Sequence, residues 1–184
     1  MSFDIGNFRS KGLKKSGARP NLFDVQITKA PVPDIMNKTE FIMLCKIASI
    51  PASTIGVIEV PYFGRNVKIP GNRTFDNISV TVLNDEDFMI RNAVESWMNS
   101  LNAHKSNKSS VAGAGGNSGN QAGTMEVKHY DRSGVAINNA KWTFTNIYPV
   151  ALGEIALDWG SNDTIEEFTI DFAYDYWTHG THTT

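Results

Sequence analysis

Alternating apolar and polar residues dominate this chain and predict a mostly β protein. The alternation is longest over residues 164–177. One face of that run is apolar or aromatic throughout, at Phe168, Ile170, Phe172, Tyr174 and Tyr176. Because successive side chains of a strand point to opposite faces, the run predicts a half-buried strand of about ten residues. Turn-forming residues at 160–163 are expected to join it to a strand at 154–159.

Shorter apolar or alternating runs predict further strands. They lie at residues 22–28, 40–47, 62–69, 75–83, 125–130 and 141–148. Pro149 is expected to end the last of them, since proline cannot donate to a central ladder. The segment 52–60, bracketed by Pro51 and Pro61, is expected to be a projecting loop with some strand character.

Residues 62–69 and 75–83 are expected to pair as a hairpin, because Pro70-Gly71-Asn72 supplies turn-forming residues between them. The second strand of this pair has one apolar and one polar face. Its apolar face is formed by Ile78, Val80 and Val82, and its polar face by Asn77, Ser79 and Thr81.

One segment has the periodicity of an amphipathic helix, with Asn84 as its expected N-cap. The acidic residues 85–87 follow, where the helix dipole favours negative charge. Apolar side chains then recur at helical spacing, at Ile90, Ala93, Val94, Trp97, Met98 and Leu101. The side chains expected to face outward are Arg91, Glu95 and Asn99. Trp97 is expected to anchor the core.

These elements predict a single domain at 20–177, built as an antiparallel β-sandwich or barrel with one α-helix. Residues 1–19 are polar and basic and are expected to form a flexible N-terminal arm. The Gly-, Ser- and Asn-rich stretch 104–124 is expected to be a flexible loop, because it cannot bury enough apolar surface to offset its ordering entropy. Residues 178–184 are expected to be a frayed tail.

Composition narrows the function classes. With 184 residues, 41% of them hydrophobic, the chain is globular, and a net charge of −2 argues against a generic nucleic-acid binder. Its single cysteine, Cys45, cannot form an intramolecular disulfide. No signal peptide and no membrane-spanning segment are expected, so synthesis is expected in a cytoplasm.

The charge is distributed unevenly along the chain. Basic side chains crowd the arm, at Arg9, Lys11, Lys14, Lys15 and Arg19. After Lys141 the chain has acidic residues but no lysine or arginine. Two interpretations stay open: solvated surface at both ends, or head-to-tail association in which the basic arm of one copy meets the acidic region of another.

No arrangement of residues predicts catalysis or cofactor binding. His179 and His182 have a spacing that a metal ion could use, but no acid or thiol lies beside them. The glycine-rich run 113–119 lacks the strand, the helix and the closing Gly-Lys-Ser/Thr of a phosphate-binding loop. Cys45 lies in an apolar run, as a small buried side chain would. The protein is therefore expected to be no enzyme and to need no cofactor.

Several blocks of residues resemble the tail tube protein family of contractile-tailed bacteriophages. They are Ala18–Phe23, Pro70–Asp76, Val80–Glu86, Tyr148–Pro149, Gly153–Trp159, Ser161–Asn162 and Phe168–Trp177. The blocks occur in family order and span nearly the whole chain. The stretch 105–123 is longer than the family needs, and the arm before Ala18 is extended and more basic.

The resemblance implies a two-sheet fold with one helix, the tail-tube fold, and assembly as hexameric rings stacked into a tube. Strands from six subunits would then complete one intersubunit β-barrel around a lumen. The implied partners are further copies of the chain, the tail sheath protein, and the baseplate and tail terminator proteins. Genomic DNA would pass through the lumen without sequence-specific binding. The implied location is the virion tail, with assembly in the host cytoplasm.

Within that picture, two sets of residues are candidates for contacts. The candidates for contacts between rings are Arg9, Lys11, Lys14, Lys15, Arg19, Ile55 and Val57. The candidates for the face that meets the lumen are Asn77, Ser79 and Thr81. Two other functions stay open: an inner-tube protein of a type VI-like secretion or other contractile injection system, and, more remotely, a β-sandwich ligand-binding domain.

Overall fold

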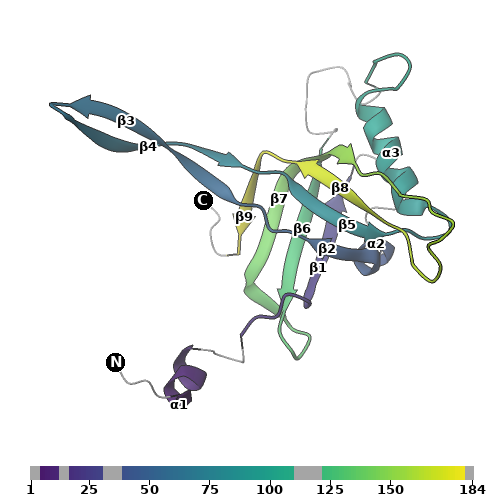
Figure 1. Ribbon diagram of the computed structural model, residues 1–184, viewed down its shortest axis with the longest axis horizontal. Helices are drawn as coiled ribbons and strands as arrows, with labels where there is room; N and C mark the ends of the chain where they lie inside the picture. Colours follow the sequence, from purple (N-terminus) through teal and green to yellow (C-terminus); the bar gives the residue numbers. More distant parts are fainter. Residues whose placement is uncertain (1–4, 13–16, 31–38, 110–121, 181–184) are drawn as a thin grey trace.

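The computed structural model of the chain describes residues 5–12, 17–30, 39–109 and 122–180 (Figure 1). Its helical segments are α1 (Ile5–Asn7), the π-helical turn η1 (Phe8–Gly12), α2 (Thr39–Leu44) and α3 (Met89–Leu101). Its strands are β1 (Phe23–Lys29), β2 (Cys45–Ala48), β3 (Ser53–Tyr62), β4 (Arg65–Phe75), β5 (Ile78–Leu83), β6 (Gly123–Tyr130), β7 (Ala136–Leu152), β8 (Glu167–Ala173) and β9 (Tyr176–His179).

The described strands form a seven-stranded sheet and a separate two-stranded hairpin, β3–β4. The order in the sheet is β1-β6-β7-β8-β5-β2, and β9 also pairs with β7. Because β7 is 17 residues long, it pairs with β6 and β9 over its first part and with β8 over its last part. We name the two parts the β6 half-sheet (β1, β6, early β7, β9) and the β8 half-sheet (late β7, β8, β5, β2).

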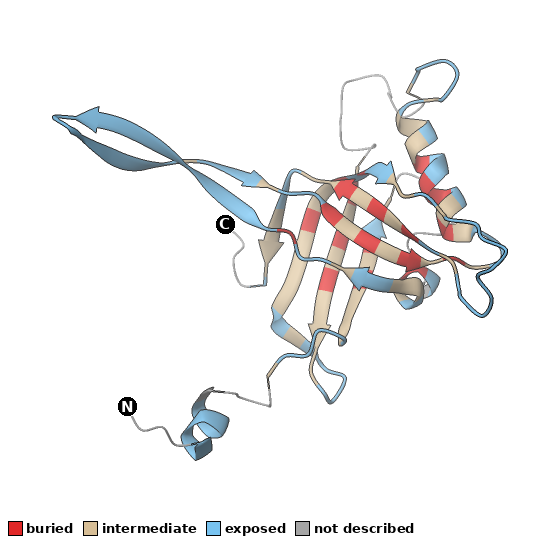
Figure 2. Cartoon of the chain, viewed as in Figure 1, coloured by how far each residue is buried: buried red, intermediate tan, exposed pale blue. Residues whose placement is uncertain are grey.

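The core lies between these half-sheets, where red positions gather in Figure 2. It includes Val25, Ile27, Met125, Val127 and Phe144 from the β6 half-sheet, and Ile78, Val80, Val82, Phe168, Ile170 and Phe172 from the β8 half-sheet. Helix α3 contributes Ile90, Ala93, Val94 and Trp97 to the same cluster, and α2 contributes Phe41. The predicted antiparallel, mostly β fold with one longer helix is confirmed.

Helix α3 buries the face that its periodicity predicts, and Trp97 is fully buried as expected. Two details of the prediction are wrong. Asn84 is no N-cap: it is buried, and its side chain donates to Glu166 at 3.0 Å, so the helix starts only at Met89. Arg91 does not point away from the domain, because its guanidinium lies 5.4 Å from the centre of the Phe168 ring and donates to the Gly153 carbonyl at 3.1 Å.

The expected hairpin of 62–69 with 75–83 is also wrong. The turn lies at Phe63 and Gly64, whose φ angles of 42° and 80° suit the tight two-residue turn that matches strand twist. The projecting segment 52–60 is therefore most of strand β3, and β4 continues through Pro70. Strand β5 pairs with β2 and β8 instead of β4.

Other expected boundaries change where tertiary packing overrides the local pattern. Residues 39–44 form α2, which turns Phe41 into the core, and only 45–48 form a strand. Strand β7 passes through Pro149, where a bulge disturbs the register with β8. Residues 154–159 form no strand, and the long run 164–177 breaks into β8 and β9 at 174–175.

Flanking segments differ slightly from their expected limits. Strand β6 begins at Gly123, inside the stretch 104–124 expected to be a loop, and 110–121 lie outside the described residues. Strand β9 ends at His179, inside the expected tail 178–184. Residues 5–12 of the arm are exposed up to Lys11 and lie apart from the sheet (Figures 1 and 2).

Candidate assembly surfaces

Two side chains considered in the sequence analysis, His179 as a possible metal ligand and Cys45 as a cysteine in an apolar run, lie within the described residues. No group of three or more His, Cys, Asp or Glu side chains in the described part of the chain is placed to bind a metal ion. His182 lies outside the described residues. Burial, with a smaller contribution from the charge of Asp24, raises the pKa of the half-buried Cys45 thiol to about 12. The thiol is therefore protonated and a poor nucleophile at neutral pH.

None of the described helices is both long and apolar enough to cross a membrane.

The hairpin β3–β4 is exposed along nearly its whole length and projects away from the sheet (Figures 1 and 2). Every residue of β3 is exposed, and so are nearly all residues of β4. Many of these exposed side chains are large and apolar: Ile55, Val57, Ile58, Val60, Tyr62, Val67 and Ile69. Apolar surface of this extent on one projection indicates a surface that another protein covers.

The register of the hairpin divides these side chains between its two faces. Ile58 pairs with Ile69, and Val60 with Val67, so these four alternate onto one face. The sequence-predicted contacts Ile55 and Val57 alternate onto the other face, together with Glu59 and its ion-pair partner Lys68 at 3.8 Å. Both faces of the hairpin therefore expose apolar side chains.

Gly56 and Gly71 lie close together where the register of the hairpin shifts. The register shifts between Ile55 and Val57, on either side of Gly56. A Cβ atom on Gly71 would lie 3.1 Å from the Gly56 carbonyl oxygen. A larger residue at Gly71 would therefore push the strands apart at the point where the hairpin leaves the domain.

The basic arm offers a second exposed surface. Arg9 and Lys11 are exposed, and Ile5 and Phe8 beside them are 75% and 62% exposed. Arg19 is also exposed, while Lys14 and Lys15 lie outside the described residues. In Figure 1 the described arm lies on the opposite side of the domain from the 153–166 loop, which carries part of the acidic region. The expectation that the arm contacts another copy stays a prediction.

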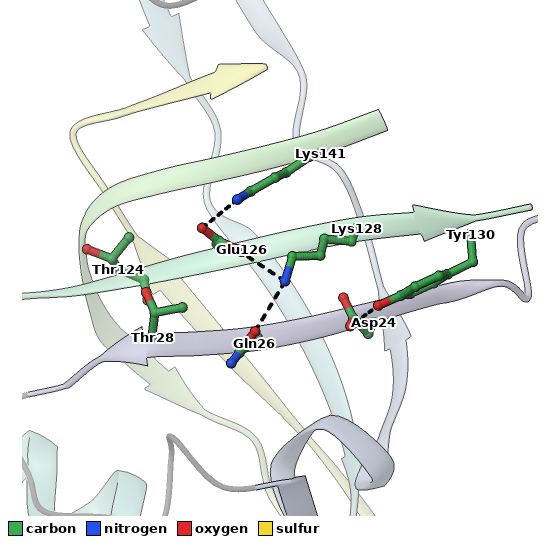
Figure 3. A network of polar contacts seen from close by, with 8 residues as sticks. All are labelled: Asp24, Gln26, Thr28, Thr124, Glu126, Lys128, Tyr130 and Lys141. Carbon is green, nitrogen blue, oxygen red and sulfur yellow. Dashed lines mark hydrogen bonds and ion pairs between the residues drawn. The ribbon is translucent and has the colours of Figure 1, made fainter. Parts of the chain in front are cut away.

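The outer face of the β6 half-sheet carries a continuous set of polar side chains (Figure 3). We call this set the polar ladder: Asp24, Gln26, Thr28, Thr124, Glu126, Lys128, Tyr130, Lys141, Thr143 and Thr145. Its charges are paired. Glu126 accepts from Lys141 at 2.8 Å and lies 3.3 Å from Lys128, which also donates to Gln26 at 3.2 Å. Tyr130 donates to Asp24 at 2.5 Å.

These contacts change how the ladder titrates. Burial by itself would raise the pKa of Glu126, but hydrogen bonds from Lys141 and Lys128 outweigh it and lower the pKa below its ordinary value. The hydrogen bond to Asp24 raises the pKa of Tyr130 to about 12. At neutral pH, Glu126 is therefore ionised between its two lysines, and Tyr130 is neutral.

The outer face of the β8 half-sheet holds Ser79 and Thr81, two of the residues expected at a lumen. Both are half-buried: Ser79 donates to Asp171, and Thr81 lies 3.3 Å from the hydroxyl of Thr169. Asn77, the third, is exposed just before β5 and is not part of the strand. No contact among the described residues tests a lumen role, so this expectation stays a prediction.

Sequence reasoning missed the polar ladder as a unit. Its signal is present in 125–130, where the polar positions alternate with buried ones. Only the pairing of β1, β6 and β7 shows that residues as distant as Asp24 and Lys141 share one surface.

A known protein family matches most of this chain. The family model described as phage tail tube protein matches residues 18–180. The chain belongs to the phage tail tube protein family. Tail tube protein gp19 of Enterobacteria phage T4 is 32% identical to it over 176 residues, which cover 96% of this chain and 94% of the relative. The Serratia phage KSP90 tail tube protein is 26% identical over 132 residues, covering 72% and 71%.

Solved structures show the same fold at low identity. A chain of the sheath–tube complex of an extracellular contractile injection system aligns with a TM-score of 0.59 at 16% identity, covering 97% of this chain and 98% of that one. A chain of the anti-feeding prophage cap aligns with a TM-score of 0.62 at 18% identity, covering 88% and 89%. The family model and the T4 relative confirm the tail tube resemblance seen in the sequence, and the solved structures confirm the fold.

Proposed function

We propose that copies of this chain form hexameric rings that stack into the inner tube of a contractile tail, and that this tube conducts DNA into the host cell. The observation that carries the proposal is the hairpin β3–β4, exposed on both faces in a member of the tail tube family. An isolated two-stranded hairpin is marginally stable in water. In the tube, neighbouring copies of the chain cover the exposed apolar side chains of the hairpin.

Closure into a barrel explains the open sheet edges in the same way. Strands β1 and β2 end the sheet order, and the outer edge of a strand is a template for pairing with another chain. A ring in which strands of neighbouring subunits continue one barrel removes these edges. The exposed position of the hairpin supports a role for Ile55 and Val57 in contacts between rings. The charge of the arm supports the same role for Arg9, Lys11, Lys14, Lys15 and Arg19.

The partners proposed for this chain follow from its family and from the assemblies in which its fold occurs. Chains with the same fold occur in a baseplate, a sheath/tube terminator and a sheath–tube complex of contractile injection systems. We propose that this chain likewise contacts a sheath, a baseplate and a terminator, in a virion tail assembled in the host cytoplasm. Its role is structural, without catalysis or cofactor. The alternative inner tube of a secretion-type injection system would carry protein in place of DNA.

Assembly is tested with the purified full-length chain by analytical ultracentrifugation and electron microscopy, with and without a baseplate template. Rings or tubes of even diameter are expected at high protein concentration, or on addition of the template. A chain that stays monomeric at high concentration and moderate salt, even with the template, would contradict the proposal. Tubes that attach to a host cell and deliver protein from particles without DNA would favour the secretion alternative.

A further inference from the structure

We propose that Tyr174 is a positioning residue for assembly: together with Phe75 and Trp177 it holds the base of hairpin β3–β4 at one angle to the domain. We name these three residues the aromatic latch. The inference rests on the tube proposed above, because a hairpin that other copies of the chain must cover has to point in one direction.

Exposure along the hairpin shows where it is attached to the domain. All residues of β3 are exposed, and all residues of β4 except Gly71 and Phe75. Because glycine has no side chain, Phe75 carries the only half-buried side chain of these two strands, all of whose residues are described. It is the last residue of β4, at the point where the hairpin joins the domain (Figure 1). The direction of the hairpin therefore depends on the contacts of Phe75 and of the residue that follows it.

The ring of Phe75 is connected to the core through two other aromatic rings. Its centre lies 6.0 Å from that of Tyr174 and 6.1 Å from that of Trp177. Tyr174 in turn packs edge-on against the fully buried Phe144, with 5.0 Å between ring centres. Aromatic pairs prefer such separations and inclined ring planes. The latch therefore joins the base of the hairpin to the hydrophobic core.

Hydrogen bonds at the base link both hairpin strands to the latch. The Tyr174 hydroxyl donates to the carbonyl of Asp76, directly after β4, at 2.6 Å. The Asp76 amide donates to the carbonyl of Ala52, directly before β3, at 3.3 Å. Burial, with a smaller contribution from the charge of Asp76, raises the pKa of Tyr174 to about 12. At neutral pH the hydroxyl therefore keeps the proton that it donates.

Tyr174 lies in the link between β8 and β9, and this link is itself anchored. The next residue, Asp175, donates its amide to the Thr145 carbonyl at 3.1 Å and accepts from the Asn146 side chain at 2.5 Å. Thr145 and Asn146 lie where β7 passes from pairing with β9 to pairing with β8. Side chains held by strands are positioned more precisely than side chains on loops. The latch thus rests on the corner that joins the two half-sheets.

The length of the hairpin makes its angle important. The ten residues of β3 span about 30 Å at ~3.3 Å per residue. With that length, a rotation of about 10° at the base moves the tip by about 5 Å. Preorganised interfaces form with backbone shifts of about 1 Å or less. A hairpin whose angle varies would therefore bind other copies more weakly, because binding would first have to order it.

Distances measured by pulsed EPR on the dilute monomer test whether the latch fixes this angle. Spin labels are attached at Arg65→Cys, beside the turn of the hairpin, and at Ser96→Cys, on the exposed side of α3, in a Cys45→Ala background. With the latch intact, one narrow distance distribution is expected. Tyr174→Phe keeps the ring and removes only the hydroxyl, and it is expected to broaden the distribution.

Two further variants bracket this result. The matched control Tyr130→Phe deletes a hydroxyl that donates to Asp24 in the β6 half-sheet, and it should leave the distribution narrow. Phe75→Leu removes the ring of the hairpin itself. It is expected to broaden the distribution more than Tyr174→Phe does, because two ring contacts are lost.

Pelleting of tubes connects the angle to assembly. Since the loss of one hydrogen bond shifts an equilibrium about fivefold, Tyr174→Phe is expected to need about fivefold more protein before tubes appear. Its thermal unfolding should stay within about 4 °C of wild type. A merely structural role would lower the unfolding temperature without broadening the distance distribution.

The outcomes separate this inference from the proposed function. A distribution that stays narrow in both Tyr174→Phe and Phe75→Leu would overturn the inference. A broadened distribution with assembly at the wild-type concentration would overturn it as well. A wild-type chain that forms no tubes under any condition would contradict the tube itself, while the distances in the monomer would still decide whether the latch holds the hairpin.

Discussion

The hairpin gives the sharpest quantitative test of tube formation. The double variant Ile55→Thr, Val57→Thr keeps β-branched side chains in β3 and replaces apolar groups by hydroxyls. In the single chain, Ile55 is 49% exposed and Val57 is 61% exposed. The folded monomer therefore covers only about half of each side chain, and the other half can be covered only on assembly.

The size of this effect follows from the exposed fractions. Complete burial of a Val or Ile side chain contributes about 1.5–3 kcal/mol. Since about half of each side chain is still exposed in the monomer, covering the rest contributes about 1 kcal/mol per residue, or ~2 kcal/mol for the pair. A loss of ~2 kcal/mol weakens each contact between subunits about thirtyfold.

Pelleting of tubes over a series of protein concentrations measures this change directly. The double variant is expected to need about thirtyfold more protein before tubes appear, while its thermal unfolding stays within a few degrees of wild type. The matched control is Val135→Thr, an equally exposed valine (62%) in the turn between β6 and β7. That control should assemble normally.

A second double variant shows which face of the hairpin makes the contact. Ile58→Thr, Val60→Thr makes the same change on the opposite face of the hairpin. If the Ile55 and Val57 variant assembles at the wild-type concentration, those residues make no contact between rings. If neither double variant changes assembly, the idea that other copies cover the hairpin is refuted.

Three further predictions concern the core, the pH dependence and the arm. Phe172→Ala removes a fully buried ring beside Trp97 and is expected to lower the free energy of unfolding by about 3–5 kcal/mol in urea titrations. Burial raises the pKa of Tyr174 from 10.0 to about 12, so the folded state holds this proton more tightly than the unfolded state. Its contribution to stability is complete below pH 10.0 and is lost as the pH rises through about 12, and Tyr174→Phe should lack that loss in unfolding measured between these values. Deleting residues 2–17 should leave the domain folded by circular dichroism but weaken stacking, and the difference from wild type should be largest at low salt, where the charges of the arm are least screened. Tubes of normal length and normal salt dependence would reject this role.

Local patterns were sufficient where neighbours along the chain decide the structure. The helical spacing of Ile90 to Leu101 predicted the buried face of α3, since that face depends only on the helical repeat. The alternation of 22–28 and 125–130 predicted two strands of the β6 half-sheet for the same reason. Blocks of residues in family order were sufficient for the tail tube assignment.

Only the tertiary structure decided how these elements pair. Pro70-Gly71-Asn72 has the composition of a turn, yet Phe63-Gly64 makes the turn, because the pairing of β3 with β4 determines where the chain reverses. The assembly surfaces depend on pairing in the same way. Alternation in the sequence shows that Glu126 and Lys141 each point away from a core, but only the register of β6 with β7 brings the two charges together. Strand pairing is a contact between distant residues, so its register is absent from any local pattern and appears only once the core has packed.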